Sequence, residues 1–116
     1  MENKIYHNPQ CNKSRETLKL LHENNANVKI VEYLKTPPTA DELLMLCQKL
    51  GIAPKELIRF QEKIAQELGI SKASNKTDID WCQIMSKNPK LIERPIVVLN
   101  GKVILGRPPT KVLDII

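Results

Sequence analysis

Residues 95–105, PIVVLNGKVIL, predict a β-hairpin near the end of the chain. Two runs rich in β-branched residues flank Asn100-Gly101. Asn-Gly favours the positive φ angles that a two-residue type I′ turn requires at both of its central positions. The hairpin therefore supplies an antiparallel pair of strands. Residues 110–116 follow with apolar side chains at helical spacing, which predicts a closing helix.

The other end of the chain predicts a β-α-β unit. A short strand ends at about His7, where Asn8-Pro9 interrupts the apolar run. Helix-forming residues begin at Asn12, and residues 28–34, VKIVEYL, form a second strand rich in β-branched and aromatic residues. A helix between two strands favours a right-handed parallel crossover.

Residues of about 39–87 form a helical block between these two parts. Thr39 and Glu42 have the spacing of a capping box, and Gly51 follows the apolar stripe of the helix that they begin. Residues 77–87 predict another helix, with Ile79, Cys82 and Met85 on roughly one face. The order β-α-β, helical block, β-β-α is that of a thioredoxin-like mixed α/β sheet with inserted helices, and residues 1–116 are expected to form a single domain.

Charge and composition limit the classes of partner. The formal net charge is +5, but the basic residues are scattered and only four residues are aromatic. This pattern argues against nucleic-acid binding and favours an anionic small substrate or an acidic protein partner. The sequence has neither an apolar run of about 20 residues nor a signal-peptide pattern. We expect a cytoplasmic monomer that does not enter a membrane.

The chain has three cysteines, Cys11, Cys47 and Cys82, and no C-x-x-C pair. This spacing supports neither a structural zinc site nor an intramolecular dithiol motif. Cys47 and Cys82 lie on the apolar faces of predicted helices, where buried, inert thiols are expected.

Cys11 has a different setting, between a strand-turn segment and the start of a helix. The first turn of a helix offers unpaired N–H groups and the positive end of the helix dipole, which stabilise a thiolate or a bound anion. Ser14 could donate a hydrogen bond to the sulfur, and His7 and Arg15 could add positive charge. The pattern alone is compatible with a reactive cysteine and with a structural one.

Residues 7–15, HNPQCNKSR, resemble the opening motif H-N-P-x-C-x-x-S-R of the glutaredoxin-coupled arsenate reductase family. The resemblance continues in order along the chain and spans essentially all of it. The matching segments are YLKTPPT (33–39), ELIR (56–59), RPIVV (94–98) and GRP (106–108).

The resemblance implies a role for each matching residue. Cys11 would attack arsenate to form a Cys–As(V) adduct, glutathione would attack the arsenic, and glutaredoxin would complete the reduction to arsenite. Glutathione would be a co-substrate, and no metal or tightly bound cofactor is implied. The implied oxyanion ligands are Arg59, Arg94 and Arg107, the implied thiolate-tuning residues are His7 and Ser14, and the implied structural cis-proline is Pro95.

Other interpretations stay open at this point. Arg59 could be a solvated charge at a helix end, and Arg94 and Arg107 could be ordinary rim residues. One departure follows Arg59, where residues 60–63 are FQEK whereas characterised arsenate reductases tend toward Lys-Asn.

Two alternative functions use the same fold. One is a monothiol, glutathione-dependent oxidoreductase, but three arginines suit a tetrahedral oxyanion better than a peptide-like disulfide. The other is a redox-related transcriptional regulator that binds RNA polymerase. The resemblance to that branch would imply a C-x-x-C redox switch at the start of the helix. In this chain Ser14 stands where the second cysteine of that motif would be, which argues against such a switch.

Overall fold

The computed structural model describes all residues from 1 to 116, and they form two compact units. The sheet unit comprises Met1–Thr36 and Arg94–Ile116, and the helical unit comprises Pro37–Glu93. The predicted helical block of about 39–87 lies inside the helical unit. None of the helices combines the length and the apolar character that a membrane span requires.

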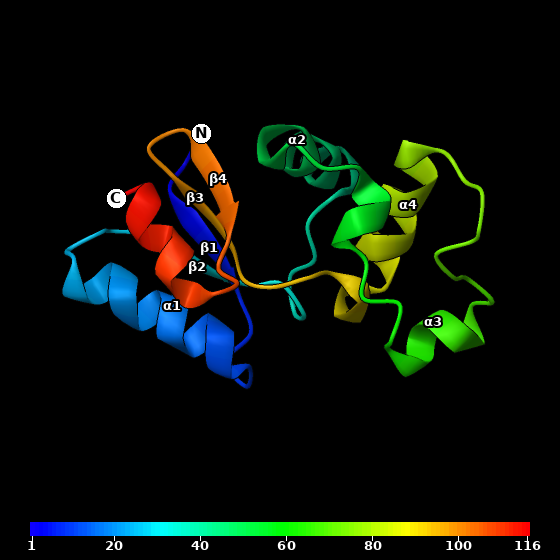
Figure 1. Ribbon diagram of the computed structural model, residues 1–116, viewed down its shortest axis with the longest axis horizontal. Coiled ribbons are helices and arrows are strands. Elements are labelled where there is room, and N and C mark those ends of the chain that lie inside the picture. The colour runs from blue at the N-terminus through cyan, green and yellow to red at the C-terminus, as the bar shows by residue number, and fades with distance from the viewer. The chain divides into compact units, whose positions relative to one another are not determined.

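The sheet unit contains four strands in the order β2-β1-β3-β4, which are labelled in Figure 1. Strand β1 (Lys4–His7) pairs in parallel with β2 (Lys29–Glu32) and antiparallel with β3 (Ile96–Leu99). Strand β4 (Lys102–Leu105) extends the sheet beyond β3 in an antiparallel pairing. The predicted mixed thioredoxin-like sheet is therefore confirmed.

The hairpin turn between β3 and β4 is also confirmed. Asn100 and Gly101 have φ angles of 54° and 76°, the two positive values that a type I′ turn requires. The second strand is shorter than predicted, because the chain turns after Glu32, whose carbonyl accepts hydrogen bonds from the N–H groups of Lys35 and Thr36. The closing helix is a 3-10 helix, η3 (Pro109–Asp114), rather than an α-helix.

Helix α1 (Asn12–Glu23) and η3 lie side by side, as the blue and red ribbons of Figure 1 show. Together with the sheet they enclose a core of six buried apolar side chains. These are Ile5, Leu21, Val97, Leu99, Val112 and Ile115. This core packs the later turns of α1, through Leu21, against β1 and β3.

The helical unit consists of short helices and 3-10 turns: α2 (Ala40–Leu50), η1 (Pro54–Leu57), α3 (Lys63–Glu67), α4 (Asp78–Lys87) and η2 (Pro89–Leu91). The predicted ends of α2 are confirmed. The hydroxyl of Thr39 accepts a hydrogen bond from the Glu42 N–H at 3.1 Å, and Gly51 has a φ of 73°.

The predicted buried face of α4 was wrong in one position. Ile79 is 36% exposed, and Trp81 is buried together with Cys82 and Met85. Trp81 offers more apolar area than Ile79, so its burial sets the rotation of the helix. Its ring makes an edge-to-face contact with Phe60 at a centroid distance of 5.8 Å.

Candidate active site

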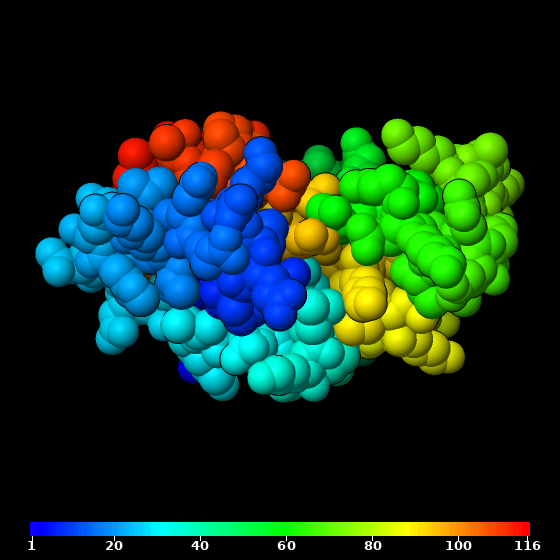
Figure 2. All heavy atoms as spheres, turned by 90° about the horizontal axis from the view of Figure 1, so that it is seen from below, coloured from blue at the N-terminus to red at the C-terminus, as the bar shows by residue number.

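Cys11 is the N-cap residue of α1, at the end of the loop that leaves β1. Its N–H donates to the Asn8 carbonyl at 3.0 Å, which closes a turn. Its own carbonyl accepts the first hydrogen bond of the helix from the Arg15 N–H, also at 3.0 Å. The thiol is half-buried and faces the free N–H groups of the first helical turn. Figure 2 shows the first part of the chain, drawn in blue, at the molecular surface.

The surroundings of Cys11 lower the pKa of its thiol. Desolvation is the largest single effect and acts in the opposite direction, since burial disfavours the thiolate. The backbone N–H of Ser14, the hydrogen bond and charge of the Arg94 guanidinium, and the backbone N–H of Lys13 together outweigh it. The site therefore holds a larger fraction of the thiolate, the nucleophilic form, than a free cysteine does.

Ser14 acts differently from the sequence expectation. Its hydroxyl oxygen lies 2.5 Å from Nδ1 of His7 and accepts a hydrogen bond from the Asn8 N–H at 3.0 Å. The hydroxyl is thus directed away from Cys11, and the contact that Ser14 makes with the sulfur comes from its backbone. Both His7 and Ser14 are buried.

The pKa of His7 is lowered, so its imidazole carries less positive charge at neutral pH than that of a free histidine. Desolvation is the main cause of its lowered pKa, the charge of Arg15 lowers it further, and Glu32 on the neighbouring strand opposes both effects. Arg15 is exposed on α1. Its guanidinium donates to the Pro9 carbonyl at 2.8 Å and to the side chain of Asn12, and so it braces the loop that carries Cys11.

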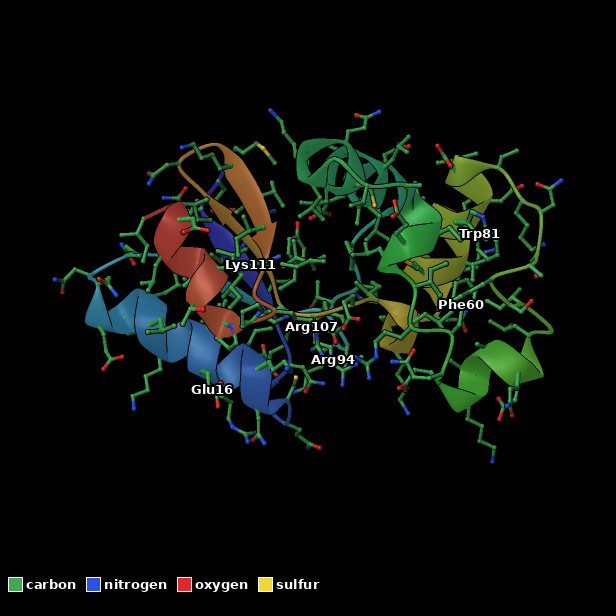
Figure 3. All side chains as sticks on the ribbon, viewed as in Figure 1. Glu16, Phe60, Trp81, Arg94, Arg107 and Lys111 are labelled. Atoms are coloured by element: carbon green, nitrogen blue, oxygen red, sulfur yellow. The ribbon has the colours of Figure 1, made fainter.

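Arg94 and Arg107 come from the two ends of the β3–β4 hairpin and are labelled in Figure 3. Each precedes a proline across a cis peptide bond, so Pro95, the expected cis-proline, has that geometry. Nη1 of Arg107 donates to the Arg94 carbonyl at 3.1 Å. Arg94 contacts Cys11 directly, and Arg107 is held beside the backbone of Arg94.

Gly106 packs this hairpin against α1. A Cβ atom at this position would lie 2.5 Å from Oγ1 of Thr17 and 2.8 Å from Cγ of Pro95. The Gly106 N–H donates to the Pro95 carbonyl at 3.0 Å. Only glycine, which has no Cβ atom, allows the backbone to approach Thr17 and Pro95 this closely. Arg107 is the next residue along the chain.

Arg59 belongs to the helical unit and is not a solvated surface charge. Its side chain is 13% exposed and pairs with Glu93 at 2.9 Å and with Glu62 at 3.4 Å. Its role as an oxyanion ligand stays a prediction. Neither carboxylate was predicted from the sequence. The spacing of three residues could have indicated Glu62, whereas no local signal connects Arg59 with Glu93.

Cys47 and Cys82 are buried, as predicted. Desolvation is the main reason why the pKa of Cys47 is raised to about 12 and that of Cys82 to about 11. Cys11 is therefore the one cysteine of the three whose thiol pKa is lowered.

Comparison with known proteins finds relatives that match almost the whole chain. The model of the ArsC family matches residues 6–115. The uncharacterized protein YfgD of Escherichia coli (strain K12) is 49% identical over 114 residues, covering 97% of this chain and 95% of YfgD. An arsenate reductase of the same strain is 40% identical over 112 residues, covering 97% of this chain and 79% of that protein. The solved structure of an arsenate reductase from Vibrio cholerae superposes with a TM-score of 0.91 at 44% identity, covering 100% of this chain and 98% of the other.

Proposed function

The chain belongs to the ArsC family, and on that premise we propose that it reduces arsenate to arsenite with glutathione and glutaredoxin as electron donors. The observation that carries the proposal is the contact of the Arg94 guanidinium with the Cys11 sulfur at the N-terminus of α1. A cation and free N–H groups at one sulfur both stabilise a thiolate and attract an anion.

The reaction begins when the Cys11 thiolate attacks arsenic and displaces one oxygen as water. Guanidinium groups complement the remaining oxygens through charge-assisted hydrogen bonds and stabilise the charge in the transition state. Arg94 and Arg107 would fill this role from the sheet unit. Arg59 is proposed as the third oxyanion ligand on the family pattern alone.

Reduction from As(V) to As(III) takes two electrons. We propose that a glutathione thiol and a glutaredoxin thiol provide them and leave joined as a mixed disulfide. Hydrolysis of the Cys11–arsenic bond then releases arsenite and restores the thiol. An external donor fits this chain because Cys47 and Cys82 are buried and have raised pKa values, so neither is suited to resolve the adduct.

We propose that His7 and Ser14 hold the Cys11 thiolate in position and do not stabilise it with a positive charge of their own. Their contact fixes the first turn of α1, whose N–H groups face the sulfur. We place the protein in the cytoplasm, where glutathione keeps thiols reduced. We also propose that it is a monomer.

The test is arsenite formation in a glutaredoxin-coupled assay with glutathione. Wild type is expected to turn over and Cys11→Ser to show none, while Cys47→Ala, a matched loss of a cysteine outside the site, retains activity. If wild-type protein forms no arsenite but removes glutathione from glutathionylated proteins, the monothiol oxidoreductase is the correct function instead.

A further inference from the structure

Arg59 is enclosed by two carboxylates within the helical unit. Nη1 donates to Oε1 of Glu93 at 2.9 Å, and Nη2 donates to Oε2 of Glu62 at 3.4 Å. We refer to these three residues as the Arg59 cluster. The side chains of Glu93 and Glu62 are 24% and 30% exposed, so water screens the cluster only in part.

The backbone sets up this arrangement. An antiparallel bridge joins Ile58 to Ile92, with hydrogen bonds from the Arg59 N–H to the Leu91 carbonyl at 2.8 Å and from the Glu93 N–H to the Leu57 carbonyl at 2.9 Å. The bridge places Arg59 and Glu93 on neighbouring segments. A turn closed by the Glu62 N–H and the Arg59 carbonyl at 3.1 Å brings Glu62 back to the same guanidinium.

The charges of the Arg59 cluster do not favour a multiply charged anion. One guanidinium and two carboxylates sum to −1, and both Nη atoms already have carboxylate partners. The Nε atom is buried without a hydrogen-bond partner. An oxyanion that binds Arg59 must therefore displace a carboxylate or approach two of them within a few ångströms, where like charges repel strongly.

We propose that Glu62 and Glu93 are specificity-determining residues that weaken the binding of multiply charged oxyanions by occupying Arg59. This inference rests on the proposed assignment of Arg59 as an oxyanion ligand. Its consequence is a preference for oxyanions of lower charge, since these meet less repulsion from the two carboxylates. A reductase with this cluster binds the fully charged substrate less tightly than its arginines alone would allow.

The experiment measures the binding of inorganic phosphate by calorimetry, which requires no turnover. Glu62→Gln and Glu93→Gln keep the size of each side chain and remove one charge. Each is expected to tighten phosphate binding roughly fivefold, the scale of one partly exposed ion pair. Glu67→Gln is the matched control, since Glu67 is an exposed carboxylate on α3 and the change in net charge is the same.

A second set of variants tests whether the tighter binding of phosphate depends on Arg59. In the Arg59→Gln background, Glu62→Gln is expected to give a smaller gain than in the presence of Arg59, because no guanidinium is released and only the repulsion between Glu62 and the anion is removed. For arsenate turnover, Glu62→Gln is expected to lower KM roughly fivefold at constant kcat, the pattern of uniform binding.

Three results would overturn the proposal: no gain in either variant, an equal gain in Glu67→Gln, or a gain that is as large without Arg59 as with it. These outcomes are separate from failure of the proposed function. That failure would show as missing arsenite formation by wild-type protein, whatever the phosphate affinities of the variants.

Discussion

The Nδ1 atom of His7 lies 2.5 Å from the hydroxyl oxygen of Ser14, and this contact joins the end of β1 to the first turn of α1. Because the hydroxyl is engaged there and with the Asn8 N–H, the backbone of Ser14 is the part that faces Cys11. The two side chains thus shape the thiolate site indirectly, by fixing the turn on which the sulfur sits.

The lowered pKa of His7 predicts a loss of stability in acid. A histidine whose folded pKa lies below its unfolded value of 6.5 binds a proton more readily when unfolded. Its contribution to stability is therefore complete above pH 6.5 and is lost as the pH falls from there through the folded pKa. Denaturant unfolding between about pH 5 and pH 8, the range in which histidine titrates, should show this loss in wild type and less of it in His7→Gln.

His22 provides the matched control, since it is exposed on α1 and is the only other histidine. His22→Gln should retain the acid-dependent loss of wild type. If His7→Gln and His22→Gln have the same pH profile as wild type, the lowered pKa assigned to His7 is incorrect.

Substitution of Arg94 and substitution of Arg107 should have different effects on the reactivity of Cys11. Arg94 contacts the sulfur, so Arg94→Gln should raise the thiol pKa and slow alkylation of Cys11 at neutral pH several-fold. Arg107 contacts the Arg94 backbone, so Arg107→Gln should leave the alkylation rate of Cys11 nearly unchanged. We expect bound phosphate to slow alkylation of Cys11, and Arg107→Gln should weaken this protection. Iodoacetamide kinetics with and without phosphate measure both effects. Equal rates in the two variants would contradict the assigned contacts.

Gly106→Ala should destabilise the sheet unit by about 1–3 kcal/mol, the usual cost of overpacking. The new methyl group would meet Thr17 and Pro95 at distances that atoms do not tolerate. Thermal unfolding measures the loss. Adding Thr17→Ala removes one of the two clashes and should restore part of the stability, whereas an unchanged melting temperature in Gly106→Ala would refute the close approach.

The buried cysteines should resist modification. At neutral pH and below, iodoacetamide should label native protein once, at Cys11, because the pKa values of Cys47 and Cys82 are about 12 and about 11. Mass spectrometry of the intact protein counts the labels, and denatured protein should carry one on each of its three cysteines. Rapid labelling of Cys47 or Cys82 in the native state would show that the helical unit opens more readily than its burial indicates.

Local patterns predicted much of this fold, because the interactions behind them are local. The Asn100-Gly101 turn and the Thr39 cap depend on residues within a few positions of each other, and both are present. The rotation of α4 was missed because it depends on where Trp81 packs rather than on helical spacing alone.

The setting of Cys11 at a helix start was likewise visible in the sequence, and the family motif singled out Arg94, whereas the partners of Arg59 and of the Ser14 hydroxyl were not visible. The pairing of Arg59 with Glu93 spans 34 positions, and it depends on an isolated backbone bridge that no periodic pattern in the sequence predicts. The orientation of the Ser14 hydroxyl depended on the position of His7 across the turn. Contacts of this kind emerge only when the segments are folded together.

The ionisation of Cys11 tests the central claim most directly. The ultraviolet absorbance of the thiolate can be followed from acid to mildly alkaline pH, with Cys11→Ser as the baseline, because Cys47 and Cys82 stay protonated in that range. We predict a single transition with its midpoint below the ordinary thiol value of about 8.5. A midpoint at or above that value, with phosphate absent and with phosphate present, would contradict the claim that this site holds a thiolate for attack on an oxyanion.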